Sequence, residues 1–218
     1  FTRSSVYKFA CFLILKLTPY IVSERNIQLE GSALAQRIFA LFGWKVVFRG
    51  LPAKQGVLIA YPHTSNWDFP VSMLCKWSMG IPVRFWGKDS LFKIPLFGPW
   101  LRWLGGVPVQ RGSARGMVGD TVAEIVQARE RDEMFWLALA PEGTRAKTDG
   151  WRSGFYQVAC QADVPVGLAY FDYQKREVGV DYFLRLTGDV EADFVAIHAY
   201  LAHRPGKTPA RASPVRLK

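Results

Sequence analysis

Cysteine and histidine are both scarce in this sequence, which contains three of each among 218 residues. The three cysteines are far apart and lie in apolar surroundings, at Cys11, Cys75 and Cys160. This spacing predicts neither a disulfide framework nor a metal site, and it indicates a reducing compartment. His198 and His203 also lack the spacing of a zinc-binding pair. We therefore expect no bound metal ion.

The sequence also lacks an uncharged apolar run long enough to cross a bilayer. Residues 6–22 are strongly apolar but include Lys8 and Lys16, whereas a spanning helix needs about 20 largely uncharged residues. On a helical wheel the two lysines lie within about 80° of each other, opposite an apolar face, which predicts a helix lying in the membrane interface. A second apolar helix is expected at 33–42. No small-residue cleavage site follows, which argues against a signal peptide; alternatively, both helices pack on the domain.

Acidic residues are outnumbered, and the net charge is +10. Five positive charges lie in the last segment of the chain, at Arg204, Lys207, Arg211, Arg216 and Lys218. A basic chain suits nucleic acid, an anionic membrane or phosphate-bearing substrates. No recognition helix, zinc finger or RNA-binding signature is present, so we expect no nucleic-acid partner. Residues 204–218 contain few apolar side chains, which predicts a disordered basic tail.

From residue 44 onward, strand-like and helix-like segments alternate. We expect strands near 45–49, 57–61, 83–86, 107–109, 134–140, 165–171 and 178–184. We expect helices near 67–77, 96–104, 114–130, 154–162 and 191–203. This alternation predicts one α/β domain over 44–203, with a mainly parallel mixed sheet flanked by helices. The amphipathic helix pair of residues 1–43 would precede it.

His63 is the central residue of the candidate site. It follows a continuous apolar run at 57–60, which is typical of a strand buried on both faces. Asp68 is five residues further on, and on one continuous helix the two side chains would diverge by about 140°. They meet only if His63 lies in a loop and Asp68 in the first turn of a helix. The carboxylate then orients the imidazole as a base; in the alternative, His63 is structural and Asp68 only caps the helix.

Other polar residues follow neighbouring strands of the predicted sheet. Lys88 comes after the strand at 83–86, and Arg111 comes after the strand at 107–109. The carboxyl ends of the strands form the ligand crevice of an open α/β sheet, so we expect these side chains to converge near His63. Arginine binds phosphate through paired donors, and lysine adds a point charge.

The segment Glu142-Gly143-Thr144-Arg145 follows the apolar strand at 134–140. Gly143 permits a ligand to approach the backbone, and the hydroxyl of Thr144 can donate to a phosphate oxygen. Arg145 adds a second guanidinium to the expected crevice. In the alternative, the segment is a tight turn closed by an ion pair between Glu142 and Arg145.

Between residues 45 and 173 the chain resembles the glycerolipid acyltransferases of the 1-acylglycerol-3-phosphate acyltransferase type. Residues 63–68 (His-x4-Asp) resemble the block that holds the catalytic dyad of that family. Residues 105–111 and 141–145 resemble its second and third blocks, and residues 88–98 resemble the segment between the first two. The four segments occur in the order that the family shows.

Two positions depart from the family pattern. Pro62 precedes the histidine where the best-known lysophosphatidate enzymes usually carry asparagine, and residues 164–169 lack the second proline usual in the fourth block. These departures bear on the identity of the acceptor more than on acyl transfer.

The resemblance implies transfer of a fatty acyl group from a thioester, acyl-CoA or acyl carrier protein, to the hydroxyl of a lysophospholipid such as 1-acylglycerol-3-phosphate. His63 would be the general base, oriented by Asp68. A thioester is already activated, so no serine or cysteine nucleophile and no further cofactor are required. The residues implied in substrate binding are Lys88, Arg111, Glu142, Gly143, Thr144 and Arg145.

The expected location is an anionic membrane surface, with the protein monotopic on the cytoplasmic face of an inner membrane or endomembrane. Two other functions remain open. A thioesterase or other hydrolase would use the same dyad on water, and a non-catalytic protein would use the same basic residues to bind membrane phospholipid.

Overall fold

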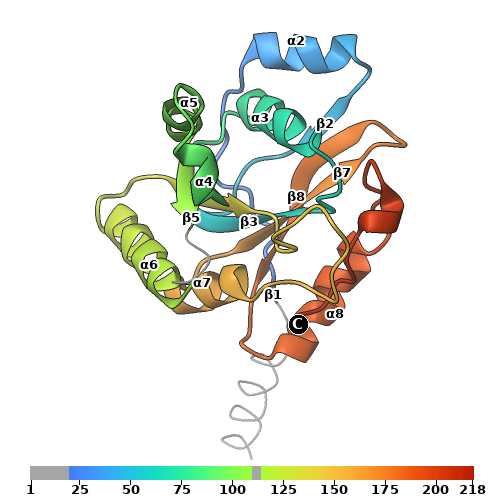
Figure 1. Ribbon diagram of the computed structural model, residues 1–218. Helices are drawn as coiled ribbons and strands as arrows, with labels where there is room; N and C mark the ends of the chain where they lie inside the picture. The colour runs from blue at the N-terminus through green and yellow to red at the C-terminus, as the bar shows by residue number, and fades with distance from the viewer. Residues whose placement is uncertain (1–19, 110–113) are drawn as a thin grey trace, which may run out of the picture.

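A mixed sheet of eight strands forms the centre of the computed structural model, which describes residues 20–109 and 114–218 (Figure 1). The strands are β1 (Tyr20–Ile21), β2 (Lys45–Phe48), β3 (Gln55–Tyr61), β4 (Val83–Lys88), β5 (Gly106–Val109), β6 (Phe135–Leu139), β7 (Val166–Asp172) and β8 (Glu177–Arg185). The sheet order is β1-β8-β7-β3-β6-β4-β5, and β2 also pairs with β8. Strand β8 runs antiparallel to its neighbours β7 and β1, and β2 runs parallel to β8. The predicted fold class, a mainly parallel mixed sheet flanked by helices, is confirmed.

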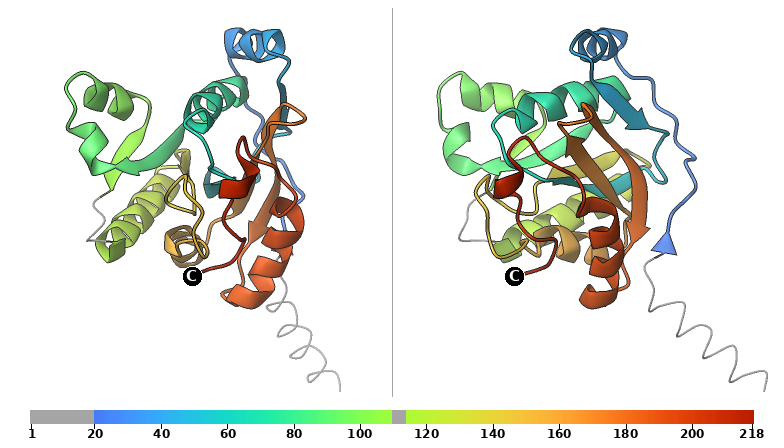
Figure 2. Two further views of the ribbon diagram at one scale, coloured as in Figure 1. Left: turned by 45° about the vertical axis from the view of Figure 1, so that its right-hand side comes forward. Right: turned by 90° about the vertical axis from the view of Figure 1, so that its right-hand side faces the viewer.

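Helices cover both faces of this sheet. The helices are α2 (Ala33–Leu41), α3 (Asp68–Met79), α4 (Asp89–Phe92), α5 (Phe97–Trp103), α6 (Ala114–Glu130), α7 (Gly154–Ala162) and α8 (Val190–Leu201). Helices α2 and α3 contribute to the core on one face, and α6, α7 and α8 contribute to the core on the other. Helices α4 and α5 lie beside β4 and the edge strand β5 (Figure 2).

The central strand β3 is buried on both faces, as its continuous apolar sequence predicts. Val57 and Ile59 are fully buried in the core under α6, α7 and α8, and Leu58 points into the opposite core under α3. Because successive side chains alternate between faces, this strand contributes to both cores. Fully burying each such side chain stabilises the fold by about 1.5–3 kcal/mol.

Of the two helices expected at the N-terminus, the described residues include the whole of the second and only the end of the first. The helix expected at 33–42 is confirmed as α2, whose Ser32 side chain accepts a hydrogen bond from the amide of Ala35. The helix expected at 6–22 falls mostly outside the described residues. The prediction is wrong for the end of this segment, because Tyr20 and Ile21 form the strand β1 and pair with β8.

The C-terminal tail is ordered, which contradicts the predicted disorder of residues 204–218. Ser213 is 1% exposed, and Leu217 forms a bridge with Trp151. The hydroxyl of Tyr61 donates to the carbonyl of Ser213 at 2.9 Å. Hydrogen bonds to backbone groups and the packing of Val215 and Leu217 on the core order this segment. Isolated apolar residues of this kind give no periodic pattern in the sequence.

Candidate active site

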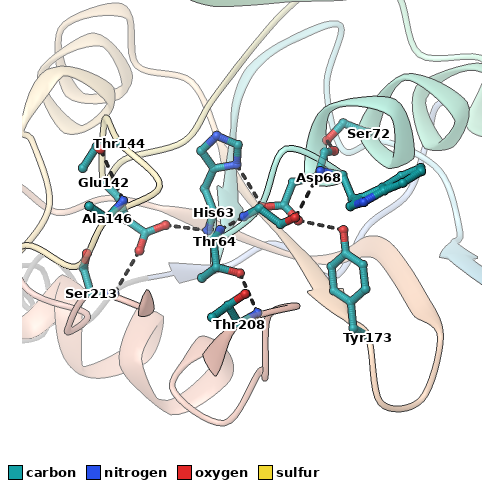
Figure 3. A network of polar contacts seen from close by, with 12 residues as sticks. His63, Thr64, Asp68, Ser72, Glu142, Thr144, Ala146, Tyr173, Thr208 and Ser213 are labelled. Carbon is teal, nitrogen blue, oxygen red and sulfur yellow. Dashed lines mark hydrogen bonds and ion pairs between the residues drawn. The ribbon is translucent and has the colours of Figure 1, made fainter. Parts of the chain in front are cut away.

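His63 and Asp68 face each other where β3 gives way to α3 (Figure 3). His63 lies in the loop and Asp68 is the first residue of the helix, which is the placement that their spacing requires. Nδ1 of His63 lies 3.1 Å from Oδ2 of Asp68. An imidazole that donates from Nδ1 carries its free lone pair on Nε2.

The carboxylate of Asp68 also shapes the loop that holds the imidazole. Its Oδ2 accepts from the backbone amides of Thr64 at 2.8 Å and Ser65 at 2.9 Å, and its Oδ1 accepts from the hydroxyl of Tyr173 at 2.7 Å. Burial alone would raise the pKa of this carboxyl, but the bonds from His63, Tyr173 and Ser65 outweigh burial and hold the pKa below its ordinary value. Asp68 therefore stays ionised and fixed beside the imidazole.

Tyr173 is a site residue that the sequence argument missed. It follows β7, which is the parallel neighbour of β3, so it stands at the same edge of the sheet as His63. The rule that located the other candidates, a polar residue after a strand, also applies to this position. Tyr173 belongs to no block of the family resemblance.

Glu142 lies behind the His63 loop. It is 1% exposed, and its two carboxylate oxygens accept from the backbone amides of His63 at 2.5 Å and Ser213 at 2.9 Å. Burial raises the pKa of Glu142, and the amide bonds offset only part of that effect. Glu142, which is expected among the substrate-binding residues, ties the His63 loop to the C-terminal tail.

The remaining predicted binding residues lie around this buried centre. Gly143 has a φ of 68°, and a Cβ there would lie 2.6 Å from Nε of Arg152, so both conformation and space favour glycine. Thr144 accepts from the amide of Ala146 at 3.3 Å, and Arg145 is exposed. The alternative ion pair between Arg145 and Glu142 does not occur among the described salt bridges.

Lys88 is exposed at the carboxyl end of β4, beside the edge strand β5. Arg111 lies outside the described residues, so its expected position near His63 stays a prediction. The phosphate-binding roles of Lys88 and the two arginines rest on the sequence argument.

An apolar cavity of about 180 Å³ runs along α3, between that helix and the sheet. Asp68, Ser72, Cys75 and Met79 line it from the first turn of α3 to the last, and His63 lines it beside Asp68. Residues at this spacing share one face of a helix, and the stretch that they cover is about 16 Å long. The cavity can therefore hold an extended aliphatic group whose polar end lies beside the imidazole.

Two classes of feature are absent from the part of the chain that the structure describes. No cluster of three histidine, cysteine or acidic side chains could hold a metal ion there. None of the helices in those residues has both the length and the apolar character needed to cross a membrane.

We expect Tyr173→Phe to lower kcat by about tenfold and the free energy of unfolding by about 1–3 kcal/mol, because it leaves Oδ1 of a buried carboxylate without its donor. The bond lowers the pKa of Asp68. Its stabilisation is therefore present above the ordinary pKa of that carboxyl and is lost as pH falls through the folded-state pKa. Denaturant unfolding at several pH values measures this difference, and Tyr182→Phe on β8 is the matched control. An equal loss in both variants would contradict the assignment.

A protein-family model described as Acyltransferase matches residues 45–167, which is more than half of the chain. This range includes the His63 loop, the cavity helix α3 and Glu142. No curated protein and no solved structure matches the chain.

Proposed function

This chain belongs to the acyltransferase family, and from that premise we propose that it moves a fatty acyl group from a thioester to the hydroxyl of a lysophospholipid, as enzymes of the 1-acylglycerol-3-phosphate acyltransferase type do. The observation that carries this proposal is the pair of His63 and Asp68, 3.1 Å apart, at an apolar cavity. A base beside an aliphatic binding space is what acyl transfer to a hydroxyl requires.

The reaction begins when Nε2 of His63 removes the proton of the acceptor hydroxyl. The oxygen attacks the thioester carbonyl, and a tetrahedral oxyanion forms. The carbon–sulfur bond then breaks, the thiolate of coenzyme A or acyl carrier protein leaves, and the proton on His63 passes to it. Asp68 stays ionised throughout and stabilises the imidazolium that forms.

The apolar cavity along α3 supports a fatty acyl group as the part that is transferred. The chain would lie between α3 and the sheet, with its thioester carbonyl beside His63. Each methylene that leaves water in such a space contributes about 0.8 kcal/mol to binding. The acyl chain therefore supplies the binding free energy, and the dyad supplies the proton transfer.

The phosphate of the acceptor would be held by Lys88, Arg111 and Arg145, and the acceptor would come from an anionic membrane surface. The net charge of +10 supports attraction to such a surface. We place the protein on the cytoplasmic face of the membrane, as a monotopic protein.

A panel of lysolipids tests the proposal. Purified protein is incubated with isotope-labelled acyl-CoA or acyl carrier protein and with lysophosphatidate, other lysophospholipids and a lyso-ornithine lipid. We expect labelled diacyl product, and the preferred acceptor identifies the substrate. Labelled free fatty acid without any diacyl product would instead support the hydrolase, and neither product would support a lipid-binding protein.

We expect Cys75→Ala to retain transfer within about threefold of the unaltered protein, because direct transfer needs no cysteine nucleophile. Cys75 lines the cavity, but burial raises the pKa of its thiol to about 12, so almost no thiolate exists at neutral pH. Steady-state kinetics measure the rate, and Cys160→Ala is the control. A loss of transfer with trapping of an acyl-cysteine in the unaltered protein would show a covalent mechanism instead.

A further inference from the structure

Helices α4 and α5 and the turn between them carry an exposed apolar surface, which we call the aromatic lobe. Its exposed side chains are Leu91, Ile94, Leu96, Phe97, Trp100 and Trp103. Leu96 is 88% exposed and Trp103 is 76% exposed. The lobe lies beside the edge strand β5, at the opposite side of the molecule from α8 (Figure 2). Contiguous apolar surface of this kind marks an interaction site.

The two most exposed side chains of the lobe, Leu96 and Trp103, lie outside the packed core. The buried side of the lobe is formed by Phe92, Gly98 and Leu101. Gly98 lets the two helices approach, because a Cβ there would lie 2.1 Å from the carbonyl oxygen of Phe92. Leu96 has a φ of 62°, a conformation that a leucine disfavours. An exposed leucine at a strained position serves neither the core nor the turn, which indicates a role outside the folded chain.

The aromatic lobe continues into the cavity. Phe97 packs on Trp100 with ring centroids 5.4 Å apart, and Trp100 meets Phe69 at 6.3 Å. Phe69 in turn packs on Phe85 at 5.6 Å, and both of these rings line the cavity beside His63 and Asp68. An aliphatic chain could thus pass from the lobe to the cavity along a path of aromatic side chains.

We propose that the aromatic lobe docks on an anionic phospholipid bilayer and delivers lipid substrate to the cavity, an inference that rests on the proposed function. Tryptophan favours the boundary between headgroups and acyl chains because its ring is apolar and its N–H is polar. Exposed Lys88, Lys93 and Arg102 lie in or next to the lobe. Asp89 pairs with Lys93 at 3.1 Å, so the surface keeps a net positive charge toward anionic headgroups. The aromatic path to the cavity favours a lipid surface over a protein partner, because a lipid chain can enter this path and the surface of a folded protein cannot.

The test is co-sedimentation of the purified protein with vesicles of phosphatidylcholine and phosphatidylglycerol, in the absence of any acyl donor. We expect the double variant Leu96→Gly/Trp103→Ser to bind these vesicles at least about tenfold more weakly, because it removes two apolar side chains from the interface. Val195→Ser is the matched control, since Val195 is 71% exposed on α8. It should bind like the unaltered protein.

The single variant Leu96→Gly is a control for misfolding, because glycine adopts a positive φ without strain. This variant should be at least as stable as the unaltered protein and still bind vesicles more weakly. Unchanged vesicle binding by both Leu96 variants overturns the proposal. Loss of self-association, measured by sedimentation velocity, with vesicle binding intact also overturns it, and assigns the lobe to contact with a second copy of the chain.

The outcomes separate the docking surface from the proposed function. Transfer to a short-chain lysolipid that is monomeric in vesicle-free solution should be the same in the double variant as in the unaltered protein. If vesicle binding falls as expected but the unaltered protein transfers no acyl group, the docking surface stands and the proposed function fails. If transfer occurs and vesicle binding does not fall, only the docking surface fails.

Discussion

Replacing His63 with alanine is expected to lower kcat for acyl transfer by about 10³-fold, within the range that general-base catalysis contributes. The expectation follows from the position of the imidazole, whose Nδ1 is held by a buried carboxylate while the ring lines the apolar cavity. KM should change little, because the proposed site for the acyl chain lies along α3 rather than on the imidazole. Initial rates with labelled thioester and the preferred lysolipid measure both constants.

His203→Ala is the control for this experiment, because His203 is exposed and lies beyond the end of α8. Both variants should show the same far-UV circular dichroism and the same thermal midpoint within a few degrees. If His63→Ala still transfers the acyl group, another residue must be the base, and the pair of His63 and Asp68 has a structural role.

Replacing Glu142 with alanine is expected to lower the free energy of unfolding by about 2–4 kcal/mol, because the part-buried amide of His63 and the buried amide of Ser213 lose their shared acceptor. The same change frees the backbone of the His63 loop, so kcat should also fall if His63 is the base. Glu142→Gln retains one acceptor oxygen and should lose about half as much stability. Chemical denaturation of the folded variants measures the difference.

Glu133→Ala is the matched control, because Glu133 is exposed and its side chain should contribute less than about 0.5 kcal/mol. A substrate-binding role for Glu142, as the family resemblance implies, would give a different pattern. KM would rise strongly in Glu142→Ala while stability stayed close to that of the unaltered protein.

The architecture of the sheet could be predicted from the sequence because apolar periodicity is local. The continuous run at 57–60 predicts a strand buried on both faces, and β3 has that environment. The spacing of His63 and Asp68 was sufficient to predict that they meet only across a loop and a helix start. Both inferences use residues that are close in the sequence.

The parts that could not be predicted depend on contacts between distant residues. Tyr173 reaches Asp68 across 105 positions, and Ser213 reaches Glu142 across 71 positions. These are single hydrogen bonds to buried oxygens, and no apolar pattern in the sequence predicts them. The order of the tail was missed for the same reason.

Acyl transfer is tested most directly by following the acyl group when labelled acyl thioester is incubated with the folded protein and the lysolipid panel. We predict that the label enters diacyl lipid faster than it enters free fatty acid, and that His63→Ala slows the formation of diacyl lipid by about 10³-fold. Label that enters free fatty acid at the same rate with and without a lysolipid, and never enters diacyl lipid, would contradict acyl transfer.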